Sequence, residues 1–480
     1  MAVDMYEMTI GIECHVQLAT KSKLFSGADN DARDKSPNTA VSPIDFGLPG
    51  MLPVLNKEAV VLAVKAGKAL GSEIAPVSRF DRKHYFYPDL PKGYQISQMY
   101  QPIILGGKVV APLDDGSTVT VRLHHAHLEE DAGKLTHHGD YSLVDLNRAG
   151  TPLIEIVSEP DIHSAAEAKA YAVELHRLMT YSGVTLGNLY HGNMRFDVNI
   201  SVAKKGATEL GTRAEVKNLN SFRSVERAAL YEFERQVALL EKGGVVIQET
   251  RGWDDATGKT SSQRSKEDAQ DYRYMPDPDI PPIVLDGDEV AAIQAEVPVL
   301  PEYYRTQWKV LTLDRSVIEA LLDTQSYAVL VDAVQQGFGN DAARRVAHWF
   351  ASAVSTTNDD AAVIASNFAP EGYGELAEMV TKNELSSTAA KEVFQALLTS
   401  EKTPREIATE KNLLQVSDEG AVLAIVEEVL ADPASQQSIV DIKAGQGKAI
   451  GFLVGQVMKR SQGKANPALA QQLIRKRLGL

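Results

Sequence analysis

The sequence changes character near Pro298, and this change limits the folds that the chain can adopt. Up to about residue 295, apolar and polar residues alternate in short runs between glycines and turns, a pattern typical of strands with one buried face. After Pro298 the apolar residues recur at helical spacing and strand patterns are few. Two helices interrupt the first region, one from the capping box at Ser164–Glu167 to about Gly183 and one from about Ser224 to Lys242. Strands and helices without regular alternation favour an α+β domain.

We therefore predict the α+β fold class and three domains. A large sheet-based domain covers residues 1–297, an all-α helical domain covers 298–410, and a small α-helical tail domain covers 411–480. A length of 480 residues agrees with two to four domains. Thr403-Pro404 and Asn466-Pro467 predict helix starts, because an N-cap residue precedes proline at the first helical position.

Composition and the N-terminus indicate a cytosolic protein. Hydrophobic residues make up 44% and charged residues 24% of the chain, which is ordinary for a globular protein. We expect no membrane segment, because no apolar run approaches the length that a spanning helix needs and the N-terminus lacks a signal-peptide core. The single cysteine, Cys14, excludes internal disulfides and a multi-cysteine zinc site. We predict a cytoplasmic location.

Carboxylates stand where strand patterns favour apolar residues. Glu13 and His15 share the polar face of a strand over Ile10–Leu18, close enough to touch one ion. Glu155 lies within the apolar run PLIEIV, so we expect it to have a cationic partner. HLEED adds Glu129, Glu130 and Asp131, and carboxylates with one imidazole suit magnesium or manganese better than zinc. The spacing alone leaves a solvated acidic edge as the alternative.

The charge is distributed unevenly along the chain. The net charge is −15, yet Ile442–Leu480 contains eight basic residues and no acidic one. An acidic body with a basic tail indicates an anionic partner, with a solubilising tail as the other interpretation. The basic residues proposed for contact with such a partner are Lys459, Arg460, Lys464, Arg475, Lys476 and Arg477.

Several long motifs resemble one family. They include GIECHVQL from Gly11, GLPGMLPVLN from Gly47, FDRKHYFYPDLPKGYQISQ from Phe80, HLEEDAGK from His127 and SLVDLNRAGTPLIEIVSEPD from Ser142. EVKNLNSF, QETRGWD and DYRYMPDPDIPP follow further along the chain. Together they are similar to GatB, the tRNA-binding component of the aspartyl/glutamyl-tRNA(Asn/Gln) amidotransferases, and the basic tail resembles the YqeY-like domain of that family.

The resemblance implies a cradle-shaped first domain and a specific reaction. Members of this family bind Glu-tRNA(Gln) or Asp-tRNA(Asn) and use ATP with Mg²⁺ to phosphorylate the side-chain carboxylate. Ammonia from an amidase component then displaces phosphate, and a small third component completes the heterotrimeric GatCAB complex. The basic tail is expected to contact the tRNA backbone. The sequence does not tell which of the two tRNAs is the natural substrate.

Motif by motif, the resemblance implies site residues. The metal ligands would be Glu13, His15, Glu130 and Glu155. Lys92 matches a lysine that gates the ammonia conduit, with an exposed turn lysine as the alternative.

Two further expectations concern phosphate and zinc. Arg195 and Lys217 stand on polar strand faces and are hypothesised to contact phosphates. Some members of the family bind zinc through cysteine pairs before the GLPG motif, and this chain has none there, so no zinc is expected.

Two other hypotheses remain at this stage. The chain could be an adaptor that holds tRNA while another protein of the complex performs the ATP chemistry. A stand-alone metallohydrolase could use the five histidines between His124 and His138, although no HExxH arrangement supports it.

Overall fold

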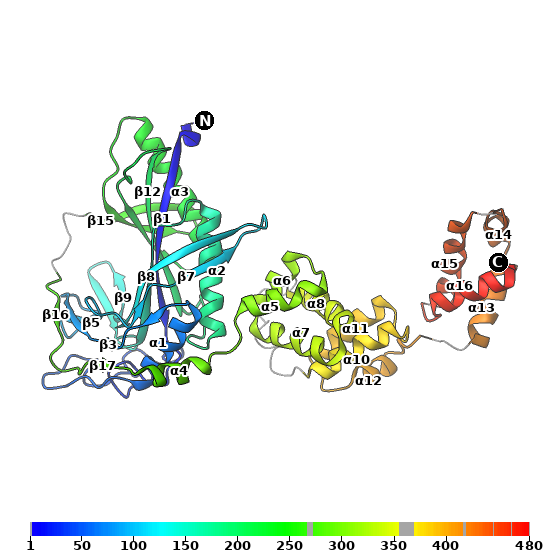
Figure 1. Ribbon diagram of the computed structural model, residues 1–480, viewed down its shortest axis with the longest axis horizontal. Coiled ribbons are helices and arrows are strands. Elements are labelled where there is room, and N and C mark those ends of the chain that lie inside the picture. Colours follow the sequence, from blue (N-terminus) through cyan, green and yellow to red (C-terminus); the bar gives the residue numbers. More distant parts are fainter. Residues whose placement is uncertain are drawn as a thin grey trace. The chain divides into compact units, whose positions relative to one another are not determined.

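The computed structural model describes residues 2–265, 272–354, 369–415, 419–444, 446–461 and 463–479. The chain divides into two compact units, Met1–Pro301 and Glu302–Leu480. Figure 1 shows strands concentrated in the first unit and helices in the second. The predicted α+β class with a helical C-terminal region is confirmed, and the division falls a few residues after the predicted boundary at 297.

A large sheet forms the centre of the first unit. Among the described residues it contains ten strands in the order β15-β14-β13-β12-β1-β11-β8-β6-β2, with β7 also paired to β8. Neighbours are antiparallel except for β13 and β14, which are parallel. The bounds are β1 Tyr6–Gln17, β2 Glu73–Ile74, β6 Ile104–Leu105, β7 Lys108–Pro112, β8 Thr118–Glu130, β11 Pro152–Ser158, β12 Met194–Lys204, β13 Ala214–Leu219, β14 Glu249–Asp254 and β15 Lys259–Ser265.

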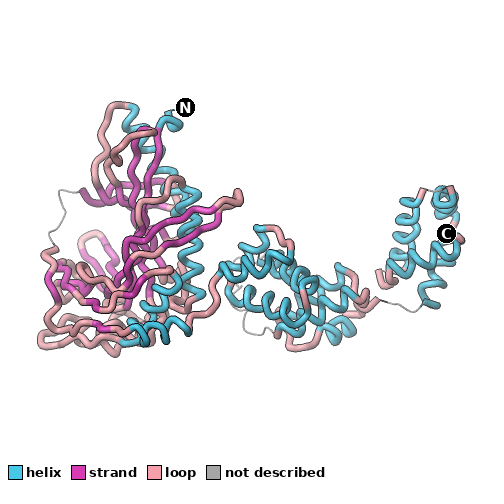
Figure 2. The backbone as a smooth tube through the Cα atoms, viewed as in Figure 1, coloured by secondary structure: helices cyan, strands magenta, loops and turns pink. Residues whose placement is uncertain are grey.

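Smaller sheets and helices complete the first unit (Figure 2). Strand β4 lies between β16 and β5, β9 pairs with β10, and β17 pairs with β3. These strands are β3 Val77–Ser78, β4 Asp81–His84, β5 Tyr94–Ser97, β9 Lys134–His138, β10 Tyr141–Asp145, β16 Met275–Pro276 and β17 Ile283–Val284. The helices are the 3₁₀ turn η1 Ala2–Met5, α1 Lys57–Ala69, α2 Ala165–Tyr181, α3 Phe222–Glu241 and α4 Gly287–Ala295.

The alternation in β1 decides which face of the sheet is covered. Ile10, Ile12, Cys14 and Val16 are buried in one core cluster with apolar residues of α1, α2 and α3. The opposite face of β1 carries Glu13 and His15 and is only partly buried. Successive residues of a strand point to opposite faces, so packing of the helices leaves the polar side chains on the open face.

Helices account for the second unit. Each has one face in a local core, and the tail helices α13, α15 and α16 share a cluster that contains Val422, Leu453 and Leu473. The predicted boundary between residues 410 and 411 falls after α12 and stays a prediction. The bounds are α5 Pro301–Gln307, η3 Trp308–Leu311, α6 Arg315–Leu322, α7 Gln325–Phe338, α8 Asn340–Val354, α10 Pro370–Thr381, α11 Ser387–Leu397, α12 Pro404–Glu410, α13 Glu419–Ala431, η5 Pro433–Ser435, α14 Gln436–Lys443, η6 Gly447–Ala449, α15 Ile450–Arg460 and α16 Pro467–Leu478.

Capping residues place several of these helices. Ser164 caps α2 by accepting a hydrogen bond from the backbone N–H of Glu167. Thr403 and Glu406 form the predicted capping box of α12, and Asn466 caps α16. Helix α3 begins at Phe222, slightly earlier than predicted, because Ser221 is its cap. Across the described ranges, every helix is too short or too polar to span a membrane.

Candidate active site

A row of polar side chains crosses the open face of the large sheet. His15 of β1 lies opposite Glu155 of β11 on one side and opposite Arg195 of β12 on the other. Glu155 in turn lies opposite His127 of β8. Side chains of directly opposite residues in antiparallel strands share one face and are near neighbours. The register therefore brings together residues that are more than 100 positions apart in the sequence.

The centre of this row is a cluster of His15, Glu129 and Glu155, here called the histidine–carboxylate cluster. His15 Nε2 lies 3.6 Å from Glu129 Oε1 and 3.7 Å from Glu155 Oε2. One ligand atom from each residue lies within 4.8 Å of the other two. The structure thus brings together His15 and Glu155, as the sequence predicted, with Glu129 as the third member.

Glu130 does not join this cluster, contrary to the prediction. Its carboxylate contacts Lys92 Nζ and accepts a hydrogen bond of 2.9 Å from the backbone N–H of Ile96. Neighbouring residues of a strand point to opposite sides, so only one of Glu129 and Glu130 can share the face of His127. Lys92 and Glu130 therefore form a buried ion pair outside the cluster.

Glu13 belongs to a second group on the same face, here called the carboxylate cluster. Its other members are Asp197 of β12 and Glu215 of β13, and the carboxylate oxygens again lie within 4.8 Å of one another. Lys217 Nζ lies 2.7 Å from Asp197 Oδ2 and 2.9 Å from Glu215 Oε1. The predicted metal ligands are thus divided between two adjacent groups, and the sequence analysis missed Asp197 and Glu215.

Electrostatics of the carboxylate cluster depend on Lys217. Burial raises the pKa of Glu13, and the negative charges of Glu155 and Glu215 raise it further. Burial opposes the charge of Lys217, but the carboxylates of Asp197 and Glu215 outweigh this effect and raise its pKa. Lys217 is therefore a permanent cation at the centre of three acidic groups.

His127 is the cationic partner that the sequence predicted for Glu155 without identifying it. His127 Nε2 lies 3.3 Å from Glu155 Oε2 and 3.6 Å from Glu129 Oε2. Burial disfavours its charge, but the two carboxylates prevail and raise the pKa of His127 to about 10. The pKa of Glu155 is lowered although burial opposes this, because His127 donates to it and His15 and Lys83 are near. A buried imidazolium thus balances the acidic cluster.

The remaining histidines do not form a zinc-type site. His124 Nδ1 lies 2.7 Å from His125 Nδ1, and His125 Nε2 lies 3.2 Å from His127 Nδ1. Burial lowers the pKa of His125 to about 4, with the neighbouring imidazoles as further causes. Within the residues that the structure describes, neither group with metal-binding geometry contains more than one histidine. The metallohydrolase hypothesis gains no support from this arrangement.

Two cavities open on the polar face, one beside each cluster. A cavity of about 220 Å³ is lined by His15, Glu129, Arg195, Lys83, Tyr85 and Tyr272 among others. A cavity of about 270 Å³ is lined by Glu13 together with Gly11, Ser158, Asn199, Arg213 and their neighbours. The two clusters therefore lie between a cavity with cationic and aromatic walls and a second cavity with polar walls.

Lys83 is a further cation that the sequence analysis missed. It lies on β4 and lines the cavity next to His15 and Glu129. Burial opposes its charge, but Glu129 and the nearby groups Tyr274 and Glu155 outweigh burial and raise the pKa of Lys83. The signal in the sequence was the motif DRKHYFYP, in which Lys83 alternates with residues of the opposite face.

Asp131 fixes Arg195 at the edge of the same cavity. Its Oδ2 lies 3.0 Å from Arg195 Nη2 and 3.1 Å from Arg148 Nε. Burial alone would raise the pKa of Asp131, but the two guanidinium groups lower it. Arg195 thus stands in the predicted position on a polar strand face, held by a charged partner.

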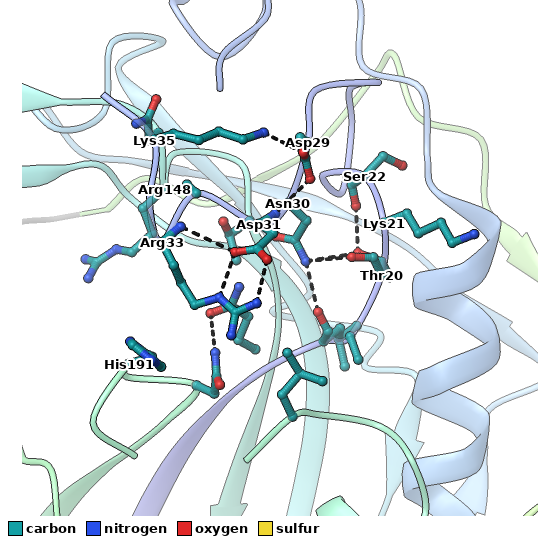
Figure 3. Close-up of a pocket in the computed structure, with 18 of the residues that line it drawn as sticks. Thr20, Lys21, Ser22, Asp29, Asn30, Asp31, Arg33, Lys35, Arg148 and His191 are labelled. Atoms are coloured by element: carbon teal, nitrogen blue, oxygen red, sulfur yellow. Dashed lines mark hydrogen bonds and ion pairs between the residues drawn. The ribbon is translucent and has the colours of Figure 1, made fainter. Parts of the chain in front are cut away.

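Arg148 also borders a third, larger cavity of about 880 Å³ (Figure 3). Its wall carries Lys21, Arg33 and Lys35, and Asn30 also lines it. Arg33 Nε lies 2.8 Å from Asp31 Oδ1, and Lys35 Nζ lies 2.5 Å from Asp29 Oδ2. Several cations of this cavity are thus neutralised by neighbours on the same loop.

The basic residues of the tail differ in their partners. Arg460 contacts Asp432, and Arg477 contacts Glu427. Lys476 Nζ lies 3.7 Å from Glu419 Oε1. In the described part of the tail, by contrast, Lys459, Lys464 and Arg475 make no ion pair.

Comparison with known proteins identifies the family. Residues 8–291 match the model described as the GatB/GatE catalytic domain, and residues 330–478 match the model described as the GatB domain. Three curated relatives are named as the B-type component of an aspartyl/glutamyl-tRNA(Asn/Gln) amidotransferase. The protein of Thioalkalivibrio sulfidiphilus is 45% identical, and those of Alkalilimnicola ehrlichii and Halorhodospira halophila are each 47% identical. Each match covers 98% of this chain and 99% of the relative.

Both clusters lie within the residues that match the catalytic-domain model, and the tail cations lie within the second match. The chain belongs to the GatB family of the aspartyl/glutamyl-tRNA(Asn/Gln) amidotransferases.

Proposed function

We propose that this chain is the tRNA-binding component of a glutamine-dependent amidotransferase. The complex converts Glu-tRNA(Gln) to Gln-tRNA(Gln), Asp-tRNA(Asn) to Asn-tRNA(Asn), or both. The side-chain carboxylate of the misattached amino acid takes the γ-phosphoryl group of ATP, and ammonia then displaces phosphate to form the amide. An amidase component supplies the ammonia, a small third component completes the heterotrimer, and the reaction takes place in the cytoplasm.

The observation that carries this proposal is the pair of clusters on one sheet face. Phosphoryl transfer between two anions needs concentrated positive charge and accurate positioning, because the attacking carboxylate and the phosphates repel each other. The histidine–carboxylate cluster and the carboxylate cluster offer six metal-ligating groups, and Lys83, Arg195 and Lys217 surround them. A binding adaptor would not need such a concentration of buried charge.

The donor set fits magnesium. His15, Glu129 and Glu155 provide one nitrogen and two carboxylates, and Glu13, Asp197 and Glu215 provide three carboxylates. Oxygen-rich sets of this kind suit a hard cation such as Mg²⁺, which also needs space for water and phosphate oxygens. When bound, Mg²⁺ would neutralise phosphate charge and align the γ-phosphorus with the attacking oxygen.

The residues of the chain divide the remaining work. The cavity beside Glu13 would hold the nucleoside part of ATP, with Asn199, Ser158 and Arg213 as polar contacts. The cavity beside His15 would hold the side chain of the attached amino acid. Lys217 and Arg195 lie on adjacent strands between these cavities, so both would contact phosphate oxygens. The carboxylate would then attack phosphorus while ADP leaves toward the first cavity.

Lys92 and Glu130 form a separate element of the proposal. Both side chains are nearly buried, and Glu130 also accepts from the backbone of Ile96. A buried ion pair that must separate before a molecule can pass is a suitable gate. We assign to this pair the control of ammonia entry, and its position on β8 next to Glu129 supports the assignment.

Variants of the histidine–carboxylate cluster test the proposal in the purified complex. Glu129→Gln and Glu155→Gln should abolish tRNA-dependent formation of ADP and of the amide while the affinity for tRNA is retained. Glu7→Gln changes an exposed carboxylate on the same strand β1 and serves as the control. If both cluster variants form amide at the rate of the control, the adaptor hypothesis is correct instead.

A further inference from the structure

Two rows of tyrosines lead away from the cavity beside His15. Tyr85 and Tyr272 line that cavity. The ring of Tyr87 stacks on Tyr85 with centroids 5.8 Å apart and planes inclined by 26°. On the other side, the ring centroid of Tyr274 lies 6.1 Å from Tyr272 and 6.4 Å from Tyr100. We call these five residues the aromatic rim.

The outer members of the aromatic rim are exposed. Tyr87 has 45% and Tyr100 has 64% of its surface accessible to solvent. Aromatic side chains of soluble proteins more often bury their rings, and exposed rings in a continuous row indicate a contact surface. Their faces are available for stacking by a planar group.

The backbone that carries the rim is fixed. The N–H of His84 donates to the carbonyl of Tyr272 over 2.8 Å, and Met275 pairs with Arg82 in the β16–β4 ladder. Asp81 Oδ2 accepts hydrogen bonds of 2.8 and 3.2 Å from the backbone N–H groups of Met99 and Tyr100. The positions of the rings relative to the cavity are therefore set by strands and a buried carboxylate.

The charges beside the rim suit a polyanion. Lys83 Nζ lies 4.9 Å from the ring centroid of Tyr272. The nearby acids Asp277 and Asp279 are paired with Arg82 at 2.8 and 2.7 Å, so their charge is largely neutralised. Aromatic faces next to cations are the features with which proteins bind single-stranded nucleic acids without reading their sequence.

We propose that the aromatic rim binds the unpaired 3′-terminal nucleotides of the tRNA by stacking their bases on Tyr87 and Tyr100. This inference rests on the proposed function, in which the amino acid attached to the 3′ end enters the cavity between Tyr85 and Tyr272. The nucleotides that precede the esterified ribose must then lie at the mouth of this cavity. Splayed, unpaired bases stack on aromatic side chains in many RNA complexes.

Binding of uncharged tRNA to the purified complex tests the rim without ATP chemistry. The variant Tyr87→Ala/Tyr100→Ala should bind intact tRNA about ten-fold more weakly than the wild type, the loss expected for stacking. A tRNA that lacks its unpaired 3′ nucleotides should bind wild type and variant equally. Tyr87→Phe/Tyr100→Phe keeps the rings and should restore wild-type affinity.

The control is Tyr141→Ala/Tyr190→Ala, which removes two exposed tyrosines outside the rim and should leave both affinities unchanged. The proposal is overturned if the rim variant binds intact tRNA normally, or if it loses equal affinity for both tRNAs. Dissociation of the complex on size-exclusion chromatography would also overturn it, and would assign the rim to a protein partner. Failure of the proposed phosphorylation would appear separately, as ADP formation that survives Glu155→Gln.

Discussion

His127 Nε2 lies 3.3 Å from Glu155 Oε2, so a buried imidazolium stands directly beside a residue that we assign to metal binding. The same nitrogen also faces Glu129. Two carboxylates in one buried cluster would repel each other without a positive charge between them. His127 therefore holds the cluster together in the folded chain and leaves the other side of both carboxylates for a ligand.

This arrangement predicts a pH dependence of stability. His127 has a pKa of about 10 in the folded chain and an ordinary value near 6.5 when unfolded. Its stabilising contribution is complete below about pH 6.5 and is lost as the pH rises toward 10. Urea titrations of the chain in the presence of a chelator should show a falling free energy of unfolding over this range. His127→Gln should flatten the fall, and an unchanged slope would contradict the role assigned to His127.

The assignment of Glu129 in place of Glu130 can be tested by paired substitution. Glu129→Gln should lower tRNA-dependent ADP formation on the order of 100-fold and raise the magnesium concentration needed for half-maximal rate. Glu130→Gln should leave that magnesium requirement unchanged, because its carboxylate faces Lys92. Initial rates over a magnesium series measure both variants. The reverse pattern would return Glu130 to the metal site.

A second buried pair predicts a loss of stability. Lys23 is fully buried, and its Nζ lies 3.3 Å from Asp45 Oδ2 and 3.4 Å from the carbonyl of Leu146. Asp45→Asn leaves the lysine charge without its partner and should cost about 3–5 kcal/mol in unfolding free energy. The double variant Lys23→Met/Asp45→Asn should recover part of this loss. Denaturant unfolding of the wild type, the two single variants and the double variant gives the coupling energy, which would be zero if the pair were independent.

The tail predicts a change in salt dependence. Replacing Lys459, Lys464 and Arg475 by Gln should weaken tRNA binding and reduce the slope of log affinity against log salt by about two to three. These are tail cations without an ion pair among the described residues. The control replaces Lys382, Lys402 and Lys411, each of which pairs with a glutamate. An equal change of slope in both variants would show that the tail has no special part in binding.

Local patterns in the sequence were sufficient for much of the fold. The alternation around Glu13 and His15 predicted β1 and its polar face, and the cap residues Ser164 and Thr403 marked helix starts. These features depend on neighbours within a few residues, where periodicity and capping are decisive.

The membership of the two clusters could not be predicted in the same way. Whether Glu129 or Glu130 meets Glu155 depends on the register of β8 against β11, which pairs Glu155 with His127. Glu13 faces Asp197 because β12 continues beside β1, although Glu13 shares a face with His15. Register between distant strands is set by the packed sheet, so the sequence of one strand cannot give it.

Both clusters are built on β1 and β12, which remain paired from Tyr6 to Val16 and from Met194 to Lys204. An insertion or deletion of a single residue in the middle of β1 would turn the side chains beyond it to the other side of the sheet. His15 would then enter the apolar core and Cys14 or Val16 would take its place. Length variation in this family should therefore be confined to loops, because one such change in this strand would remove the chemistry and the core packing together.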